Sequence, residues 1–177
     1  MIVTSRLLLR PWQESDLLVL QSLRNNIELQ ALLLATACGS SLAAVRKWAE
    51  EKSCGPDCLF FVVGLLTTKE PVGYIQLSAE AGALGVFRFG ICVMEQHQTH
   101  GYGSEAIAAI ERYLELSLRT QKIILHVDEA NVRAVKCYKT LQYRDVGVMR
   151  HHTIVRGRWR NVMIMEKLLS QATEAGD

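Results

Sequence analysis

A glycine-spaced segment, Gln98-Thr99-His100-Gly101-Tyr102-Gly103-Ser104, stands between a predicted strand and a predicted long helix. The first backbone N–H groups of a helix have no partner within the helix, and the helix dipole places partial positive charge there. Glycines at 101 and 103 would let the backbone approach an anion closely. The segment therefore predicts a cradle for a phosphate or diphosphate, built from the backbone amides of residues 98–104.

The same Gly-x-Gly spacing is also common in ordinary turns. It does not match the phosphate loop of nucleotide hydrolases, because no Gly-Lys-Ser/Thr follows. It also falls short of the three-glycine dinucleotide pattern, because Ala106 stands where the third glycine would be. The spacing alone leaves both readings open, and the rest of the chain has to decide between them.

Two polar residues further along belong to a second predicted helix. Asn131 stands at the start of that helix, where its side chain would serve as an N-cap. Tyr138 follows two turns later, and a phenol placed near a leaving group can protonate it or donate a hydrogen bond to it. The alternative for Tyr138 is a core tyrosine that packs the helix against a sheet.

Together these motifs resemble a known family. Gln98-x-x-Gly101-x-Gly103 matches the Gln/Arg-x-x-Gly-x-Gly/Ala signature of the GNAT superfamily of acyl-CoA-dependent N-acetyltransferases, and Asn131-x-x-Ala134-x-x-Cys137-Tyr138-x-x-Leu141 resembles the second signature. Thr4-Ser5-Arg6-Leu7 and Ser104-Glu105-Ala106 resemble the branch that acetylates ribosomal-protein N-termini and related small amines. The resemblance covers essentially the whole chain. One departure is Gln142-Tyr143, where the family has Gly-Phe, so that Gln142 would end a helix in a strained left-handed conformation.

The resemblance implies acetyl-CoA as cofactor and direct attack by a primary amine in a ternary complex. Two strands would splay apart to admit the pantetheine arm, which Asn131 would contact. Tyr138 would assist the departing thiol. The remaining expected cofactor-binding residues are backbone groups of Cys92, Val93 and Met94 for the pantetheine arm, and Gln98, Thr99, His100, Gly101, Tyr102, Gly103 and Ser104 for the pyrophosphate.

The group that removes the amine proton is less clearly marked. Glu95 is a candidate general base at a strand end, and its alternative is a solvated loop charge. His97 and His100 could contact cofactor phosphates, and their spacing does not predict a metal site because no third ligand is evident. His151-His152 is expected at the turn between the last two strands, either beside the acceptor or simply exposed.

The pattern of apolar residues predicts an α+β domain over residues 1–177. Strands are expected at 6–10, 59–66, 71–77, 86–94, 122–127, 143–150 and 153–167, and helices at 15–25, 41–52, 101–118 and 131–141. Residues 27–37 are ambiguous between helix and loop. The resemblance arranges these elements as a mixed, mostly antiparallel, twisted sheet of about seven strands splayed in the middle and flanked by about four helices.

Composition excludes several other classes. Twenty basic residues against 18 acidic ones give a formal charge of +2, which is too mild to indicate nucleic-acid or membrane binding. The basic stretch Arg156 to Arg160 is expected to be a hairpin tip with solvated arginines. No apolar run approaches the roughly 18 residues needed to span a bilayer, and no secretion signal is evident. Five scattered cysteines predict free thiols in the cytoplasm.

The acceptor is the least determined feature. No acidic residue falls between Glu28 and Glu50, which disfavours polycations such as polyamines or aminoglycosides. The apolar segment Leu29 to Ala37 would suit a peptide N-terminus or a less charged amine. The partner is thus a small-molecule or peptide amine, and the protein is expected to be a monomer or homodimer. The alternative function is a non-catalytic module that binds acyl-CoA as a regulatory ligand.

Overall fold

The strands of the computed structural model, which describes residues 1–55 and 57–169, form one sheet in the order β1-β2-β3-β4-β5-β6-β8-β7. All neighbouring pairs are antiparallel except β5 and β6, which are parallel. The strands are β1 (Ile2–Val3), β2 (Leu7–Arg10), β3 (Cys58–Leu65), β4 (Pro71–Ala79), β5 (Val86–Val93), β6 (Lys122–Asp128), β7 (Arg144–Val155) and β8 (Arg158–Leu168).

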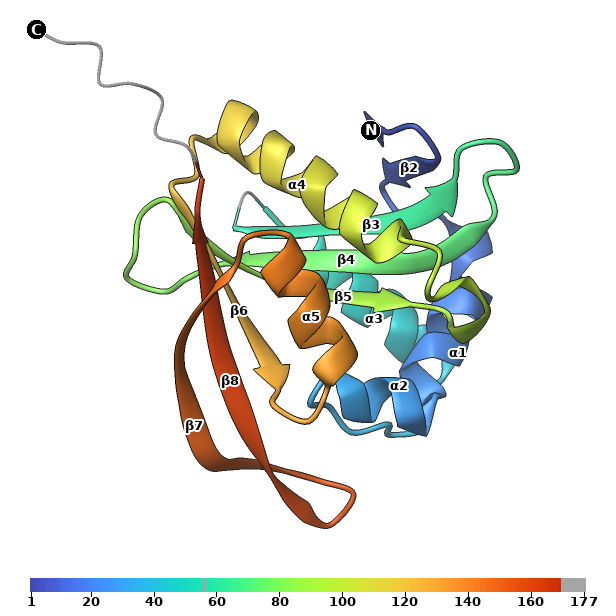
Figure 1. Ribbon diagram of the computed structural model, residues 1–177. Coiled ribbons are helices and arrows are strands. Elements are labelled where there is room, and N and C mark those ends of the chain that lie inside the picture. The colour runs from blue at the N-terminus through green and yellow to red at the C-terminus, as the bar shows by residue number, and fades with distance from the viewer. Residues whose placement is uncertain (56, 170–177) are drawn as a thin grey trace, which may run out of the picture.

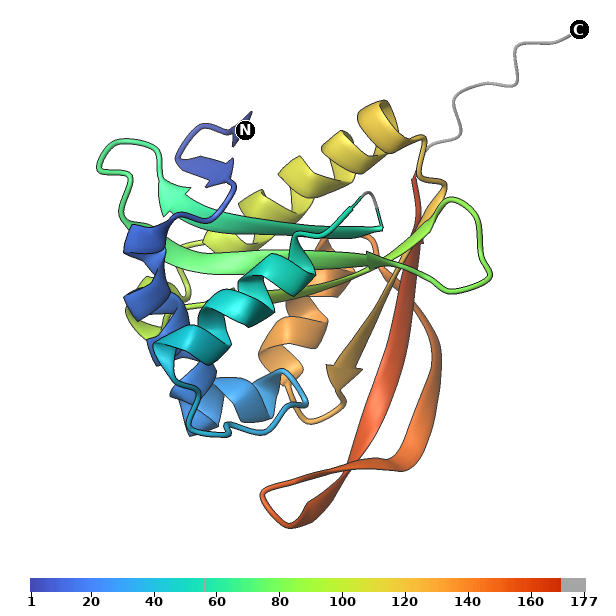
Figure 2. The ribbon, with the colours of Figure 1, turned by 180° about the vertical axis from the view of Figure 1, so that it is seen from behind.

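Helices cover both faces of this sheet. The long helix α4 (Tyr102–Leu118) and α5 (Val132–Thr140) lie on the face toward the viewer in Figure 1. The helices α1 (Leu17–Asn25), α2 (Ile27–Leu32) and α3 (Leu42–Lys52) lie on the opposite face, which Figure 2 brings forward. Two single-turn 3₁₀ helices, Glu14–Asp16 and Glu95–His97, precede α1 and α4.

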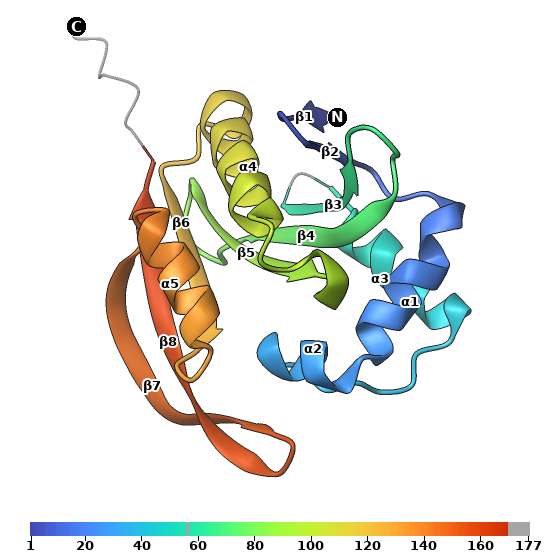
Figure 3. The same ribbon diagram turned by 45° about the vertical axis from the view of Figure 1, so that its right-hand side comes forward.

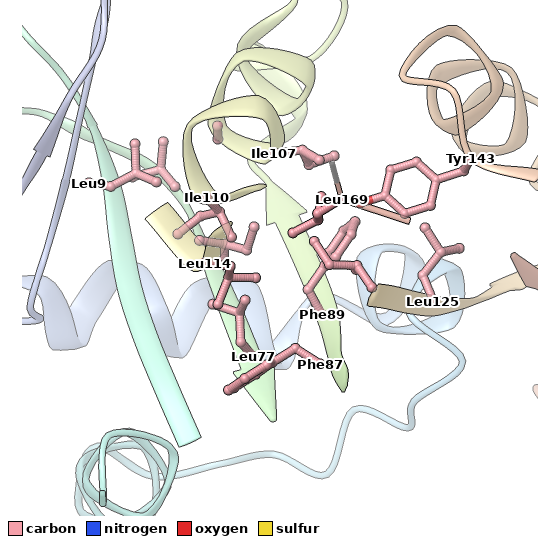
Figure 4. Packing of buried hydrophobic residues seen from close by; sticks show 14 of the residues in the cluster. Leu9, Leu77, Phe87, Phe89, Ile107, Ile110, Leu114, Leu125, Tyr143 and Leu169 are labelled. Atoms are coloured by element: carbon pink, nitrogen blue, oxygen red, sulfur yellow. The ribbon is translucent and has the colours of Figure 1, made fainter. Parts of the chain in front are cut away.

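The main core lies between the sheet and α4. Leu77, Phe87 and Phe89 are buried there because alternate side chains of a strand point to the same face. Ile107, Ile110 and Leu114 meet them from α4, as Figure 4 shows. A second cluster fills the other face, where Trp48 of α3 packs edge-on against the rings of Phe60 and Tyr74. Two cores back to back fix the sheet between its helices.

The centre of the sheet is split. β5 and β6 pair only through Val86–Arg88 and Lys122–Ile124, and their remaining residues have no partner across the boundary. Figure 3 shows the two ribbons diverging from this short contact. On the other side of β5, a Cβ at Gly73 would stand 2.1 Å from the Cys92 carbonyl oxygen, so glycine permits the close approach of β4. The expected splay is therefore present, beside a tightly paired strand.

Most expected elements are confirmed, with two short additions. β1 is too short for an alternation pattern, and the ambiguous segment after Asn26 forms the six-residue helix α2. Ser41 caps α3 as predicted by accepting from the Ala44 N–H at 3.2 Å. Gln142 adopts the expected left-handed conformation, with φ of 70°.

The prediction for the last two strands was partly wrong. The expected hairpin tip within Arg156 to Arg160 is confirmed, with the turn at residues 156–157. His151 and His152 do not form this turn but lie inside β7, which continues to Val155. The strand pairing is irregular there, and His151 has φ of 46°. The stretch Cys54-Gly55-Pro56-Asp57 is also predicted to be a turn from its Gly-Pro pair, and Pro56 lies outside the described residues.

The β7–β8 hairpin carries the basic stretch Arg156 to Arg160. Arg156 pairs with Glu28 at 2.6 Å and Arg160 with Asp128, so the hairpin's basic stretch is partly neutralised. Within the described ranges, no helix is long and apolar enough to cross a membrane.

Candidate active site

The turn before α4 adopts a conformation suited to binding an anion. The Gln98 side chain donates from Nε2 to the Val93 carbonyl at 2.8 Å and so attaches the turn to the end of β5. Thr99 has φ of 68°, and Gly101 caps α4 with φ of 79°. The N–H groups of residues 102–104 begin the helix and have no acceptor one turn earlier. We call residues 98–104 the cradle.

The N-terminal segment holds the cradle in place through Arg6 and Glu105. Arg6 donates from Nε to Glu105 Oε2 at 2.7 Å and from Nη1 to the His100 carbonyl at 2.9 Å. Its guanidinium carbon lies 4.9 Å from the centre of the Tyr102 ring. Glu105 also accepts from Thr4 Oγ1 at 2.6 Å. Glu105 therefore serves as a fixed anchor for the start of α4.

Replacing Glu105 with glutamine is expected to destabilise the fold in a pH-dependent way. Partial burial alone would raise the pKa of Glu105, but hydrogen bonds from Thr4, Arg6 and Ser5 outweigh it and lower the pKa from 4.5 to about 2. A lowered folded-state pKa stabilises the fold above pH 4.5, and this contribution is lost as the pH falls toward 2. In urea unfolding, Glu105→Gln should therefore lose much of its free energy of unfolding relative to wild type at pH 7, and less of it near pH 3. The same loss at both pH values, or an equal loss in Glu115→Gln, would contradict this.

The free edge of β5 faces the split in the sheet. The Met94 N–H donates to the Val72 carbonyl at 2.9 Å, so the backbone of Met94 is already paired with β4. Backbone groups of alternate residues point to opposite sides of an antiparallel strand. The backbone of Cys92 therefore also faces β4, whereas those of Ile91 and Val93 face the gap. Ile91 was not among the expected residues.

Helix α5 forms the other wall of the gap. Asn131 caps it by accepting the Ala134 N–H at 3.2 Å through Oδ1, which leaves its amide NH₂ for other contacts. Ser104 Oγ lies 3.2 Å from Cys137 Sγ and joins the cradle to this helix.

The Tyr138 ring packs edge-on against Phe89 and Tyr143, with both pairs of ring centres 5.9 Å apart. Burial raises the pKa of the Tyr138 hydroxyl, with a smaller effect from Cys137, so the group is protonated at neutral pH. Tyr138 therefore combines the two interpretations of its sequence motif, since it packs against the core and also lines the cavity described next.

A cavity of about 700 Å³ runs through the split and brings most of the predicted residues together. Its wall includes Cys92, Val93, Gln98, Thr99, Gly101, Tyr102, Gly103, Ser104, Asn131 and Tyr138. Three predicted residues are not in this wall. Met94 packs toward α1 and α3, His100 stacks on Tyr102 with ring centres 5.6 Å apart, and Glu95 is exposed, 3.5 Å from the Asn26 amide.

The sheet divides the cavity into two halves. Phe89, Ile91 and Val93 point toward α4 and α5, and we call this side, with the cradle, the cofactor half. Arg88 and Gly90 alternate with them and point to the opposite face, which we call the acceptor half. Register places Ser78 beside Arg88 and Gln76 beside Gly90. Lys52 of α3, His126 of β6 and His152 of β7 also line the cavity.

Of the predicted histidines, His152 lines the cavity and His151 lies against Trp159. His97 lines the cavity near Glu70, its Nε2 atom 3.9 Å from a carboxylate oxygen. No group of three or more His, Cys, Asp or Glu side chains in the described part of the chain is arranged to hold a metal ion.

A family model described as "Acetyltransferase (GNAT) domain" matches residues 6–144. The chain belongs to the GNAT acetyltransferase family. It is therefore an acyl-CoA-dependent N-acetyltransferase, and its acyl donor is acetyl-CoA.

Individual GNAT proteins are similar over nearly the whole chain. A spermidine N(1)-acetyltransferase of Vibrio cholerae is 26% identical over 96% of each chain. The structure of spermidine N-acetyltransferase from that organism, in complex with CoA and spermine, has a TM-score of 0.86, 24% identity and coverage of 95% and 98% of the two chains. A GNAT acetyltransferase from Bacillus anthracis has a TM-score of 0.82, 17% identity and coverage of 94% and 97%. These findings confirm the family and do not single out the ribosomal-protein branch.

Proposed function

We propose that this GNAT enzyme transfers an acetyl group to the primary amine of a small molecule, by direct attack of the amine in a ternary complex. The observation that carries the proposal is the single cavity through the sheet. It joins the cradle and the free edge of β5 on one side to an acceptor half on the other, where basic side chains stand beside Leu29 and Leu32 of α2. Tyr138 lies in its wall.

The described residues fit the cofactor. When bound, acetyl-CoA supplies an acetyl group activated as a thioester. The cradle offers unpaired helix N–H groups for its pyrophosphate, and Gly101 allows close approach there. The backbone of Ile91 and the N–H of Val93 face the gap and can pair with the pantetheine arm like an added strand, while the Val93 carbonyl already accepts from Gln98 Nε2. Asn131 can contact the arm from α5. Cys92 and Met94, also expected on this list, would contribute through their positions in β5 and not through free backbone groups.

Tyr138 is proposed to donate the proton that the departing thiolate takes up. Burial raises the pKa of its hydroxyl, so the proton is in place at neutral pH for a hydrogen bond or transfer to the thiolate. A free backbone N–H on β5 would polarise the acyl oxygen, an arrangement that stabilises developing negative charge. No nucleophilic cysteine is required, and Cys137 is engaged with Ser104.

The amine must lose a proton before it attacks, and two groups are proposed for this step. Glu95, expected from the sequence, is exposed and outside the cavity wall, so it would act through water. His126 lines the acceptor half directly. Partial burial and the charge of Arg88 lower the pKa of His126, so its imidazole is neutral at pH 7 and able to accept a proton. We favour His126 as the direct acceptor.

The pH dependence of kcat/KM should distinguish these two groups. Because the pKa of His126 is lowered below 6.5, the wild-type acid limb should lie below pH 6.5. His126→Gln should lose this limb and fall about 100-fold in kcat at pH 7, whereas Glu95→Gln should keep the limb and fall only a few-fold. A collapse of activity in Glu95→Gln with a normal limb in His126→Gln would reverse the assignment.

The acceptor is proposed to be a small molecule. The Vibrio cholerae relatives named above carry spermidine in their names, and spermine occupies one of those complexes. The narrower resemblance to the branch that acetylates ribosomal-protein N-termini points instead to a peptide acceptor. We favour the small molecule because Arg156 of the β7–β8 hairpin is joined to Glu28 of α2 beside the acceptor half, which narrows the room for a peptide.

Thiol release from acetyl-CoA against a panel of amino acids, amino sugars, polyamines and peptide N-termini tests the proposal, together with calorimetric titration of CoA. Turnover that depends on a small amine would support it. Turnover only with peptide N-termini would overturn the acceptor class. CoA binding without turnover on any amine would favour the non-catalytic acyl-CoA module.

We further propose that residues 1–177 work as one domain, as a monomer or homodimer, in the reducing cytoplasm. The joining of all described strands in a single sheet supports one domain. The five cysteines are all free, which supports a reducing compartment.

A further inference from the structure

The acceptor half of the cavity is positively charged. Among the described residues that line the whole cavity there is no aspartate or glutamate. Lys52 and Arg88 both line it, and His126 and His152 stand with them. Lys52 lies at the C-terminal end of α3 and forms no ion pair with any described residue. An ammonium group entering this half meets cations and no compensating carboxylate.

Three carboxylates close to the acceptor half already have cationic partners. Glu80 lies 3.4 Å from Arg88, and its buried Oε2 atom forms no hydrogen bond with any described residue. Glu28 accepts two hydrogen bonds from the hairpin residue Arg156, at 2.6 and 2.7 Å. Asp128 accepts from Arg160 Nε at 2.7 Å. Binding a polycation through any of these groups would require an existing ion pair to be broken.

Arg88 keeps capacity for a ligand despite its neighbour. A guanidinium has five N–H donors, and the 3.4 Å separation from Glu80 is longer than that of a charge-assisted hydrogen bond. Register sets Arg88 beside Ser78 on the same face of the sheet, where the hydroxyl of Ser78 adds a neutral donor. Lys52 supplies a second cation from the helix that covers this face. Two cations and a hydroxyl form a site with the chemistry of a carboxylate binder.

We propose that the acceptor amine also carries a carboxylate, which Lys52 and Arg88 bind while the amine points toward the split between β5 and β6. This inference rests on the proposed acetyl transfer to a small amine and specifies the charge of that amine. The carboxylate would hold the acceptor at the end opposite to the reacting nitrogen, near the short contact between β5 and β6. A polyamine would place its second cation in the same position, where Lys52 and Arg88 repel it.

Matched amines test the charge at the far end of the acceptor. The probes are butylamine, 4-aminobutyrate and 1,4-diaminobutane, with the six-carbon series hexylamine, 6-aminohexanoate and 1,6-diaminohexane. Within at least one series, kcat/KM for the amino acid is expected to exceed that for the monoamine by at least about 10-fold, and the diamine should be the poorest. Higher kcat/KM for the diamine than for the amino acid in both series would overturn the proposal.

Variants and a binding measurement connect the selectivity to the two cations. Lys52→Gln and Arg88→Gln should each reduce the preference for the amino acid over the monoamine, measured as the ratio of their kcat/KM values, about 10-fold. Lys47→Gln, on an exposed position of the same helix, should leave the preference unchanged. An unchanged preference in both cavity variants would contradict the assignment.

Calorimetry of the same probes with the enzyme–CoA complex separates the two proposals. Tighter binding of the amino acid without turnover of any amine would keep the carboxylate site and overturn the acetyl transfer. Turnover of amines with equal binding and equal kcat/KM across a series would keep the acetyl transfer and overturn the carboxylate site.

Discussion

Tyr138→Phe is expected to lower kcat by about 100-fold or more while the Kd for CoA stays near the wild-type value. The ring should keep its packing because phenylalanine preserves the edge-on contacts with Phe89 and Tyr143. Only the hydroxyl is lost, and it makes no hydrogen bond to another described residue. The substitution therefore removes a proton donor from the cavity wall and leaves the shape of the wall intact.

Tyr143→Phe is the matched control for this experiment. Tyr143 is equally close to Phe89, with ring centres 6.0 Å apart, but it does not line the cavity, and its hydroxyl is buried near Glu111. Kinetics with a good acceptor should show near-normal kcat in Tyr143→Phe and a deep loss in Tyr138→Phe. Equal losses in both variants would mean that Tyr138 acts through core packing. A lower kcat accompanied by a much weaker CoA complex would assign it to cofactor binding.

The sequence predicted the cofactor half better than the acceptor half, because the cofactor half comes from contiguous motifs. The cradle and α5 each lie within one stretch of chain, so their residue spacing carries the geometry. Ile91 was still missed, since the resemblance placed the contact at residues 92–94 without showing which alternate residues of the strand have free backbone groups. The backbone pairing of Met94 with Val72 shows which alternate residues of β5 have backbone groups that face the gap. The spacing of glycines in the sequence does not contain this information.

The acceptor half could not be assembled from spacing because its residues come from four separate elements. Lys52, Arg88, His126 and His152 belong to α3, β5, β6 and β7, and only the packing of these elements in the fold places them around one cavity. The parallel contact of Arg88 with Ile124 sets His126 two residues further along β6 on the same face. One signal of its charge was available in the sequence, namely the absence of acidic residues between Glu28 and Glu50.

Local backbone irregularity explains the error in the last two strands. The polar run from Arg150 to Thr153 resembles a turn between two strands, and His151 does take a left-handed conformation. Its N–H donates to the Asn161 side chain at 3.0 Å, so the neighbouring strand absorbs the irregularity and β7 continues. A short polar run inside a strand pattern is compatible with a bulge or with a turn, and only the pairing with the neighbouring strand shows which of the two forms.

Gly101→Ala is expected to weaken CoA binding by at least about 10-fold, because an L-residue in the left-handed conformation costs about 1–2 kcal/mol. Gly101 has φ of 79°, and an added Cβ would stand 3.3 Å from Arg6 Nη2. The turn can relieve this strain by rotating away from the left-handed region. That rotation would redirect the N–H groups at the start of α4, which the proposed pyrophosphate contact requires.

Gly82→Ala separates this effect from simple backbone strain. Gly82 has φ of 77° with no atom within 4 Å of an added Cβ, so the substitution should cost similar stability without touching the cradle. Calorimetric titration of CoA, with thermal unfolding measured in parallel, should show similar losses of Tm in both variants but weaker binding only in Gly101→Ala. If the two variants bound CoA equally well, the left-handed glycine would be a helix cap alone, and the anion site would have to lie elsewhere along the cavity. Weakened binding in Gly101→Ala with unchanged KM for the amine would localise the effect to the cofactor half, since the acceptor half lies across the sheet from the cradle.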